Sequence, residues 1–456
     1  MTISFGQGIT FSGTGINAGI PLCAPTITTA TTLSATSATV TFLAPPLNGN
    51  PAIKYFVATS SPGGVTATLS QSGSGTITVG GLTPANTYTF SLSAYTVFGA
   101  GLTSTPSNNI TTPAVFPGFN TPGLINGYTS PTYMNGVAVN SSGLFVAVGI
   151  DESSSYNGLF SYSTDGSTWI TPSTMGSGAS AFMTSVAVNS SGLFVAVGYD
   201  NSFFPRYATS SNGTSWTTPA IMNGSNSLGH MNAITVNSSG LFVAVGDIGA
   251  NNPAYATSSN GSTWTTPAAM NGSTDNIEMN SVAVNSSGLF VAVGQYNTTT
   301  VPVYATSSNG STWTTPAAMN GTTATVVMSS VTVNSSGLFV AVGYFGSSYY
   351  PAYATSTNGS NWTSPAVMNN SMVAAYMTAV TVTPAGIFVA VGYNPSTGVP
   401  VYATSTDGST WTTPVAMNGT ATMAYPQALA VNSSGVVVSV GWVYNGGYKA
   451  IVVRSK

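Results

Sequence analysis

The chain has 456 residues, of which only 3% are charged, and a formal net charge of −3. Ordinary soluble domains carry about 25% charged residues, so Ser, Thr, Asn and Gly must supply the polar surface here, and we expect stability to respond little to pH. There is no Lys/Arg cluster, which argues against a nucleic-acid partner. No run of 18 apolar residues predicts a transmembrane helix. The single cysteine, Cys23, cannot form an intramolecular disulfide.

Residues 1–23 form a Gly-rich segment with alternating Ile and Phe. It lacks the positive start and the unbroken apolar stretch of a secretory signal, so we expect no cleavage of such a peptide. The segment is too short to fold alone. Two interpretations stay open: a disordered tail, or an anchor in which residues 1–22 pair with strands of another virion or surface protein.

Residues 24–114 have the pattern of a β-sandwich. Four stretches alternate between apolar and polar residues, at 39–43, 53–58, 76–79 and 87–94, with Pro- and Gly-rich turns between them. The run from Leu82 to Tyr88 and the run from Ala94 to Gly101 are similar to the end of a fibronectin type III domain. This resemblance puts Tyr88 at the tyrosine corner and Phe42 in place of the usual Trp. No Arg-Gly-Asp occurs, so integrin-like recognition has no support.

From residue 115 to 456 one motif organises the chain. The stretch Val139–Gly149 (VNSSGLFVAVG) returns at a period of 48 or 49 residues, which marks a repeat architecture. Each period also has Asn-Gly or Asp-Gly between two β-prone runs, a strong hairpin signal. Two hairpins give four strands per copy, so the seven copies predict a seven-bladed β-propeller. The turn glycines are Gly143, Gly192, Gly240, Gly288, Gly337, Gly386 and Gly435.

The ends of the array predict how this ring closes. The seventh copy stops after its third strand, at residues 450–456. In most other copies the fourth strand starts with a Trp that stands fifteen residues before the next Met, as from Trp264 to Met279. Counting back fifteen from Met134 reaches Phe119. We therefore expect residues 118–123, the N-terminal strand of this domain, to complete the last blade, which leaves no sheet edge exposed.

The turns at 163–169 and 405–411 resemble the Asp-box of sialidase-type propellers, which is a structural turn remote from any active site. The usual box has one more residue between Asp and Trp, and four other copies have Asn in the Asp position. The resemblance implies the propeller architecture and no activity. Asp165 and Asp407 are expected to bond to the backbone of their own turns.

The propeller is predicted to have two unlike faces. The first-to-second and third-to-fourth strand turns share the turn face, where the copies read alike. The second-to-third and blade-to-blade loops share the variable face, where the copies differ. Function diversifies on loops of a rigid scaffold, so ligand-binding residues are expected there. They are Asp151, Asp200, Arg206, His230, Asp247, Tyr349, Tyr350 and Trp442.

Two interpretations stay open for each class of these residues. Asp151, Asp200 and Asp247 either hold Ca²⁺, which needs several oxygen ligands, or are separate solvated charges. The aromatic residues either stack on a sugar or partner, or fill the loops. No catalytic residue and no other cofactor is expected, because the chain has one histidine and only two arginines, whereas a sialidase needs three arginines.

These features predict a non-enzymatic structural or adhesive protein, located on a virion surface or outside a cell. The first hypothesis is a fibre, spike or decoration protein of a virus or phage that presents the variable face to a host glycan or receptor. The alternatives are a bacterial extracellular adhesin and a divergent glycoside hydrolase, for which eight acids could provide two facing carboxylates. The sequence names neither the ligand nor the oligomeric state.

Overall fold

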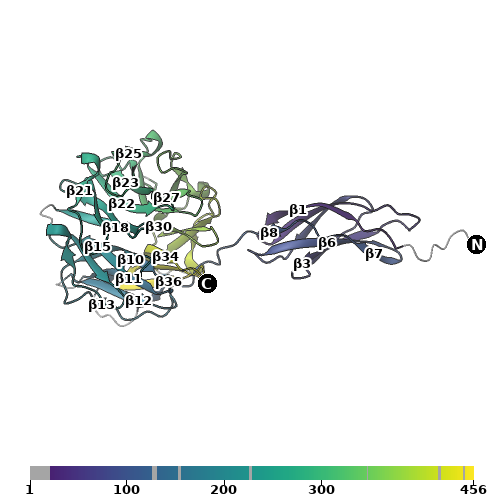
Figure 1. Ribbon diagram of the computed structural model, residues 1–456, viewed down its shortest axis with the longest axis horizontal. Helices are drawn as coiled ribbons and strands as arrows, with labels where there is room; N and C mark the ends of the chain where they lie inside the picture. Colours follow the sequence, from purple (N-terminus) through teal and green to yellow (C-terminus); the bar gives the residue numbers. More distant parts are fainter. Residues whose placement is uncertain are drawn as a thin grey trace, which may run out of the picture. The chain divides into compact units, whose positions relative to one another are not determined.

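The computed structural model describes residues 21–125, 131–152, 156–224, 228–346, 348–419, 423–444 and 447–456. The chain divides into two compact units, Met1–Val115 and Phe116–Lys456, both built from antiparallel strands (Figure 1). Helix in the described residues is limited to 3-10 turns of three residues, and none is long and apolar enough to cross a membrane. Of the predicted tail or anchor, residues 1–20 lie outside the described part of the chain.

The first unit is a sandwich of two sheets, as its alternating sequence predicts. One sheet has the order β1 (Thr26–Ser34), β2 (Ser37–Leu43), β5 (Gly75–Gly80); the other has the order β4 (Thr66–Leu69), β3 (Tyr55–Ser61), β6 (Thr87–Thr96), β7 (Gly99–Thr103), with β8 (Ile110–Thr111) paired to β6. Buried and more exposed side chains alternate along β2 and β3. The inward side chains form one core around Phe42, Phe56 and Phe90.

Two details of this unit agree with the sequence resemblance. The hydroxyl of Tyr88 accepts a hydrogen bond from the backbone N–H of Thr83 at 2.9 Å, which is the geometry of a tyrosine corner. Phe42, in place of the usual Trp, packs against Phe56 with ring centroids 4.5 Å apart. Leu22 is buried in the same core, so the packing extends to the residue before Cys23.

The second unit contains seven four-stranded sheets in the residues that the structure describes, and these are the blades of a propeller. Blade one has β10 (Thr132–Val139), β11 (Phe145–Asp151), β12 (Gly158–Ser163) and β13 (Ser173–Thr174); blade two has β14 (Phe182–Val188), β15 (Phe194–Tyr199), β16 (Pro205–Ser210) and β17 (Ala220–Ile221). Blade three has β18 (Gly229–Val236), β19 (Phe242–Ile248), β20 (Asn252–Ser258) and β21 (Ala268–Ala269); blade four has β22 (Ile277–Val284), β23 (Phe290–Tyr296), β24 (Pro302–Ser307) and β25 (Ala317–Ala318).

The remaining blades follow the same plan. Blade five has β26 (Val326–Val333), β27 (Phe339–Phe345), β28 (Pro351–Ser356) and β29 (Ala366–Val367); blade six has β30 (Tyr376–Val382), β31 (Phe388–Tyr393), β32 (Pro400–Ser405) and β33 (Val415–Ala416). Blade seven has β34 (Tyr425–Val431), β35 (Val437–Tyr444), β36 (Tyr448–Arg454) and β9 (Gly123–Leu124). Short 3-10 turns follow the outer strands of blades two to six: η1 (Met222–Gly224), η2 (Met270–Gly272), η3 (Met319–Gly321), η4 (Met368–Asn370) and η5 (Met417–Gly419).

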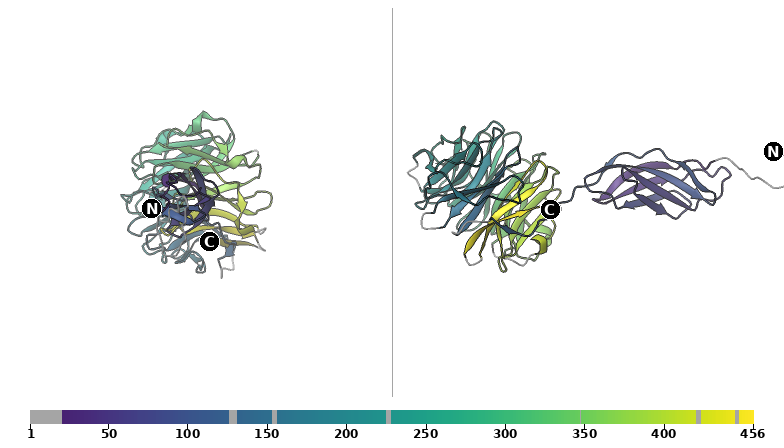
Figure 2. Two further views of the ribbon diagram at one scale, coloured as in Figure 1. Left: turned by 90° about the vertical axis from the view of Figure 1, so that its right-hand side faces the viewer. Right: turned by 90° about the horizontal axis from the view of Figure 1, so that it is seen from below.

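The first strand of each blade lies near the axis of the ring. These inner strands contact one another in sequence, and β34 contacts β10 to complete the circle. Figure 1 shows β10, β18, β22, β30 and β34 around the centre and β13, β21 and β25 at the rim. The yellow last blade lies beside the blue first blade (Figures 1 and 2).

The repeated Phe-Val-Ala-Val-Gly run forms the second strand of blades one to six, with Val-Val-Ser-Val-Gly in its place in blade seven, and is buried on both faces, as in β23. Glycine ends the run because the inner strand passes close by: a Cβ on Gly294 would lie within 1.9 Å of the carbonyl oxygen of Glu278. The inner strand is bulged at this point. In blade four Asn280 is the extra residue between Met279 and Ser281 in the register.

Two sets of side-chain hydrogen bonds join neighbouring blades. Near the axis, the bulge residue donates to a backbone carbonyl of the following blade, as from Asn280 to Met328 at 2.9 Å. At the rim, an Asn in the left-handed region reaches Thr or Ser of the following blade, as from Asn271 to Thr315. Equivalent axial bonds start from Asn135, Thr184, Asn232 and Thr378, and equivalent rim bonds from Asn223, Asn320, Asn369 and Asn418.

The ring closes through both ends of the unit, as the sequence predicts. β9 pairs antiparallel with β36, and Phe119 forms a bridge with Ser455. The N–H of Ile125 donates to the carbonyl of Ala450 at 3.0 Å. Blade seven therefore takes its outer strand from the start of the unit and its other three strands from the end.

Phe119 occupies the position of a repeat tryptophan. In blades two to six the Trp packs on an aromatic ring in the third strand of the blade before it, as Trp313 packs on Tyr255 with centroids 6.1 Å apart. Phe119 packs in the same way on Tyr402 of blade six, at 5.4 Å, and also on Phe116, at 5.1 Å. Its side chain is 1% exposed. The segment thus reproduces both the pairing and the packing of the other blades.

One detail of the predicted blade is wrong: the fourth strand does not begin at Trp-Thr-Thr-Pro. In blade three the N–H of Thr265 donates to Thr257 O at 2.9 Å, and strand pairing then resumes only at β21. Pro267 stands between them and has no N–H to donate to the ladder. Each Trp therefore serves in packing, while two residues form the regular outer strand.

Side chains that bond to their own turn backbone hold the turn face together. In blade four, Asn285 Oδ1 accepts from the N–H of Ser287 at 3.1 Å and of Leu289 at 2.9 Å. In blade six, Thr383 replaces Asn, and its hydroxyl accepts from Ile387 N–H at 3.1 Å. An acceptor oxygen at this position closes the turn.

The third-to-fourth strand turns work in the same way, as predicted for Asp165 and Asp407. Asp165 Oδ1 accepts from the N–H groups of Ser167 and Thr168 at 2.8 and 2.7 Å. These turn hydrogen bonds hold the pKa of Asp165 down at about 2, although its partial burial acts in the opposite direction. In blade three Asn260 accepts the equivalent bonds. Asn and Asp interchange here because each supplies the same acceptor oxygen.

Candidate ligand-binding site

Around the axis, the variable face carries a ring of paired positions at which the copies differ. In each blade the residue that precedes the repeated Met, or Pro426 in blade seven, pairs across the ladder with the residue that follows the repeated Gly. Both lie where the inner and second strands reach the variable face. We call these positions the axial ring. The pairs are Tyr133 with Ile150, Phe182 with Tyr199, His230 with Asp247, Glu278 with Gln295, Val327 with Tyr344, Tyr376 with Tyr393, and Tyr425 with Trp442.

Aromatic rings form a continuous series across blades five, six, seven and one, which we call the aromatic arc. Tyr376 lies between Tyr349 and Tyr393, with centroid distances of 5.1 and 5.4 Å. Tyr425 follows at 4.8 Å from Tyr393 and stacks on Trp442 at 4.0 Å. The members are Tyr133, Tyr344, Tyr349, Tyr376, Tyr393, Tyr425, Trp442 and Tyr448. Two predicted residues, Tyr349 and Trp442, therefore belong to one surface.

The arc remains accessible although its rings pack together. Tyr349 is 42% exposed, and the other members are half-buried. Burial raises the pKa of Tyr376 to about 12 and also raises the pKa values of Tyr344 and Tyr393. These phenols therefore stay protonated at neutral pH and can donate a hydrogen bond to a ligand oxygen.

Hydrogen-bonding side chains replace aromatic rings in blades three and four. We call this part of the axial ring, together with the adjacent bulge residues, the polar sector: His230, Asn232, Asp247, Glu278, Asn280 and Gln295. His230 Nδ1 lies 2.9 and 3.2 Å from the two carboxylate oxygens of Asp247, which is 2% exposed. Asn232 Nδ2 donates to Glu278 Oε1 at 3.2 Å. The sector thus presents an imidazole, two carboxylates and amides at one place.

The charges of the polar sector influence one another. The hydrogen bond with Asp247 raises the pKa of His230, against the opposing effect of burial. Burial raises the pKa of Glu278, and the nearby charge of Asp247 adds to this rise. Glu278 also raises the pKa values of Tyr199 and Tyr344, in addition to the effect of their burial. The two phenols therefore lie within electrostatic reach of one carboxylate.

A second group of rings borders the polar sector on the side of blade two. The rings of Tyr199 and Phe203 stand edge-on to His230, with centroids 4.4 and 5.4 Å away. Phe182 stacks on Tyr199 at 5.1 Å with nearly parallel planes. His230 is therefore held in orientation by Asp247 on one side and by aromatic rings on the other.

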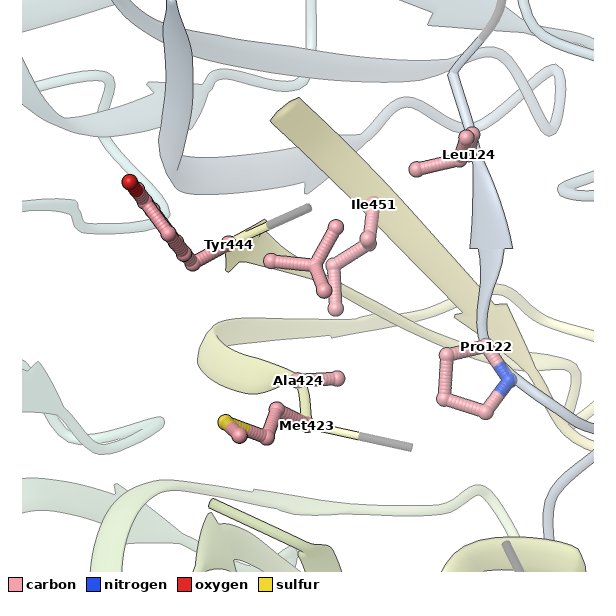
Figure 3. Close-up of a pocket in the computed structure, with 7 residues that line it drawn as sticks. Pro122, Leu124, Met423, Ala424, Tyr444 and Ile451 are labelled. Carbon is pink, nitrogen blue, oxygen red and sulfur yellow. The ribbon is translucent and has the colours of Figure 1, made fainter. Parts of the chain in front are cut away.

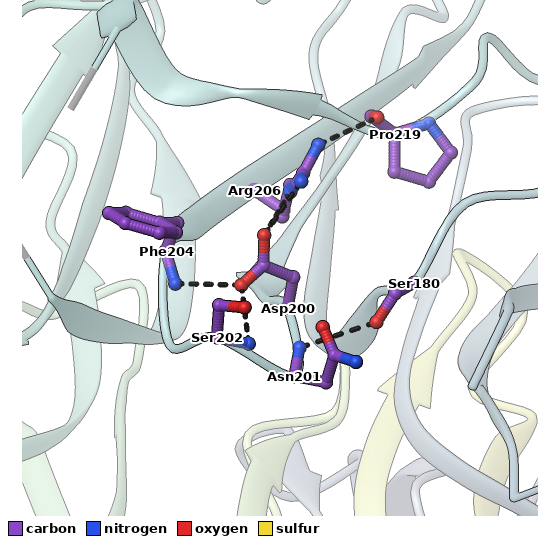
Figure 4. A network of polar contacts seen from close by, with 7 residues as sticks. All are labelled: Ser180, Asp200, Asn201, Ser202, Phe204, Arg206 and Pro219. Carbon is purple, nitrogen blue, oxygen red and sulfur yellow. Dashed lines mark hydrogen bonds and ion pairs between the residues drawn. The ribbon is translucent and has the colours of Figure 1, made fainter. Parts of the chain in front are cut away.

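Asp200 and Arg206 bond to each other rather than to the axial ring (Figure 4). Arg206 donates through Nη2 and Nε to Asp200 Oδ2, at 2.6 and 2.9 Å. Asp200 Oδ1 accepts from the N–H groups of Ser202 and Phe204, each at 2.9 Å. Asp200 is 3% exposed, so the geometry assigns the pair to the shape of the loop between β15 and β16. Its role in ligand binding stays a prediction.

The three acids that were expected to converge on Ca²⁺ do not come together. Asp151 and Asp200 stand six residues after the Phe that opens their second strands, whereas Asp247 stands five residues after it. Successive side chains of a strand point to opposite faces, so Asp247 in β19 points away from the side that Asp151 occupies in β11, and Asp200 lies beyond the end of β15. Among the residues that the structure describes, no group of three or more His, Cys, Asp or Glu could hold a metal ion. The calcium hypothesis for this set loses its basis.

Comparisons with known proteins identify the first unit. Residues 23–110 match the family model described as the fibronectin type III domain. This unit is a fibronectin type III domain. Its loop between β6 and β7 exposes Val97 and Phe98, the latter by 83%. No curated protein matches the chain.

Several solved structures are similar to the chain. A protein of unknown function from Dyadobacter fermentans has 14% identity and a TM-score of 0.45, with 75% of this chain and 100% of that chain covered. An ulvan lyase, described as a new family of polysaccharide lyase, has 11% identity and a TM-score of 0.48, with 71% and 94% covered. AofleA from Arthrobotrys oligospora has 10% identity and a TM-score of 0.42, with 64% and 87% covered. Likenesses this remote do not decide the function, which must be argued from the site.

A pocket of about 380 Å³ lies at the closing seam of blade seven (Figure 3). Figure 3 shows Leu124 and Pro122 on one side of it and Tyr444 and Met423 on the other. Its lining is mainly apolar and contains none of the predicted binding residues. It is therefore distinct from the axial ring.

The structure adds residues that the sequence prediction missed. Tyr133, Phe182, Tyr376 and Tyr425 were not predicted, yet each occupies the inner position of the axial ring. An alignment of the copies would have found them, because the copies differ at the residue before the repeated Met. Tyr350, which was predicted, instead precedes β28 at the outer end of its loop, where its carbonyl accepts from Phe345 N–H.

Proposed function

We propose that the propeller binds a glycan on its variable face, at the axial ring. The observation that carries this proposal is where the copies differ. Blades that are almost identical elsewhere place aromatic pairs on the ring in blades two, six and seven, and hydrogen-bonding pairs in blades three and four. A scaffold does not require such variety, whereas a recognition surface does.

Aromatic rings beside polar groups suit the chemistry of sugars. A ring offers a large contact area to the apolar face of a sugar, at a small entropic cost. Carboxylate, imidazole and amide groups fix orientation through hydrogen bonds to its hydroxyls. The arc and the polar sector adjoin at Tyr344 and Glu278, which are close enough for the charge of Glu278 to affect the pKa of Tyr344. A ligand across this junction meets both kinds of contact.

The proposed role is binding without turnover. The single histidine bonds to Asp247 within the ring, and one of the two arginines is held by Asp200. Incubating the full chain with a glycan panel should leave every glycan intact by mass spectrometry. Release of shortened products would instead favour the glycoside hydrolase alternative.

The proposed place of action is a surface, with a virion as the first candidate. A fibronectin type III domain and a binding propeller, on a chain with 3% charged residues, suit display outside a cell. Residues 1–22 are proposed to attach the chain to other virion or surface proteins, although Leu22, the last of them, packs in the core of the first unit. Mass spectrometry of purified particles should detect the chain. Recovery from bacterial surface fractions alone would favour the adhesin alternative.

Binding itself is tested on a glycan array with loop and turn variants side by side. Tyr349→Ala removes an exposed member of the arc and should weaken binding by about 1–2 kcal/mol, with a nearly unchanged melting temperature. Asn285→Ala, on the turn face, is the control and should keep full affinity in the fraction that is folded. If the turn variant lost binding while Tyr349→Ala kept it, function would lie on the other face.

A further inference from the structure

The charges on the variable face are almost all negative or neutralised. Asp247 and Glu278 belong to the axial ring, and the first of them bonds to His230. Glu152 also lies at this end, where it accepts from the hydroxyl of Tyr133 at 3.0 Å. With His230 protonated, its charge balances Asp247, and Glu278 leaves the polar sector with a net negative charge.

Basic side chains that could offset this charge are held elsewhere or lie far from the axis. Arg206 is bound in the ion pair with Asp200. Lys449 lies on β36, the third strand of blade seven, where it pairs with Val443 of β35. Adjacent strands are about 4.8 Å apart, so a third strand stands roughly 10 Å from the inner one. Arg454 donates to Asp165 O, on the turn face. Among the described residues, no Lys or Arg belongs to the axial ring.

We propose that the axial ring selects uncharged glycans and excludes those that carry carboxylate or sulfate groups. This inference rests on the proposed function and names its ligand class. An anionic group at the polar sector meets the negative charge of Glu278 without a free cation to compensate, and losing its hydration there is unfavourable. Neutral hydroxyls meet no such penalty.

Neutral hydroxyls also find suitable partners at this place. A carboxylate has about four acceptor positions, and the bond from Asn232 uses one of those on Glu278. Sugar hydroxyls can donate to the remaining positions. The phenols of Tyr199 and Tyr344 lie within electrostatic reach of Glu278, so an acceptor with aromatic neighbours is available to a sugar ring.

The test compares glycans that differ only in charge. Isothermal titration with the full chain would use the neutral glycan that the array ranks highest, together with its sialylated and sulfated forms. We expect the anionic forms to bind at least tenfold more weakly than the neutral form. This affinity gap, the ratio of the two affinities, should narrow in high salt, because salt screens charge repulsion. Glu278→Gln keeps the shape and removes the charge, so it should reduce the gap severalfold.

Asp275→Asn is the matched control, because Asp275 is an exposed acid three residues from Glu278 and outside the axial ring. It should leave the gap unchanged. Circular dichroism confirms that both variants are folded. The inference is overturned if the parent protein binds the anionic forms as tightly as the neutral one, or if Asp275→Asn narrows the gap as much as Glu278→Gln. Failure to bind any glycan would overturn the proposed function, and this inference with it.

Discussion

The two faces of the propeller are built from the same strands and differ in what their side chains contact. On the turn face, Asn285 and Asp165 accept hydrogen bonds from their own turn backbone. On the axial ring, side chains contact other side chains, as His230 bonds to Asp247. A residue that holds the backbone is fixed by the fold, whereas a residue that contacts a side chain can change together with its partner. Stability should therefore depend on the turn face and specificity on the variable face.

The largest expected effect tests the ring closure, whose packing reproduces that of the turn-face tryptophans. Phe119→Ala removes a ring that contacts Tyr402 and Phe116, and it should lower the free energy of unfolding by about 3–5 kcal/mol. Urea unfolding followed by tryptophan fluorescence measures this value. Leu124→Ala, on the same segment but 44% exposed, is the control and should cost much less. Similar losses in the two variants would show that Phe119 does not clasp the ring.

A smaller effect is expected at a single turn. Asn285→Ala removes the acceptor for two backbone N–H groups and should lower the free energy of unfolding by about 1–2 kcal/mol. Ser286→Ala, at the exposed neighbouring position, should be nearly neutral. Thermal melts of both proteins give the comparison. An unchanged melting temperature in Asn285→Ala would contradict the assignment of stability to the turn face.

The smallest effect concerns pH and the polar sector. The raised pKa values of Glu278 and His230 mean that the folded protein holds these protons more tightly than the unfolded chain. The free energy of unfolding should therefore decrease as pH rises above 4.5, the ordinary Glu value, and decrease further as pH rises through the folded pKa of His230. The lowered pKa values of Asp165 and Asp407 act oppositely, and their stabilisation is lost as pH falls below 3.8 towards 2.

Melting curves from pH 3 to 8 show whether stability changes with pH in the expected direction. Glu278→Gln should flatten the change just above pH 4.5, and His230→Gln the change above pH 6.5. A melting temperature that rises steadily from pH 5 to 8 would contradict both assignments. The sequence predicts little response to pH because it shows how few charged residues there are. It does not show that His230, Asp247 and Glu278 share a partly buried site.

The blades and their closure follow from the sequence because one apolar pattern returns seven times and each copy supports the interpretation of the others. Phe119 could be predicted because it keeps the spacing of the repeat tryptophans. The outer strand was misplaced because Pro267 interrupts the ladder within a stretch that otherwise favours a strand.

The axial ring could be predicted only in part, because it depends on register. Tyr376 and Tyr425 stand at strand starts that look ordinary, and only the bulged pairing places them opposite Tyr393 and Trp442. A shift of one residue moves a side chain to the other face of a strand. This separates Asp247 from Asp151, although the sequence alone had grouped the two acids by their position after the apolar run.

The clasp of β9 and β36 makes ring closure the least local step in the folding of this unit. Asn418 and its closing partner Thr121 are 297 residues apart, which corresponds to roughly 15–60 s of synthesis. Six blades are contiguous and can form in order as they leave the ribosome, but β9 stays unpaired until β36 has been synthesised. During this time β9 can pair incorrectly with the exposed edge of a near-identical strand in another blade. A chain that stalls before β36 should therefore exchange strands with a second chain. Misassembly should increase when translation slows before β36 is complete.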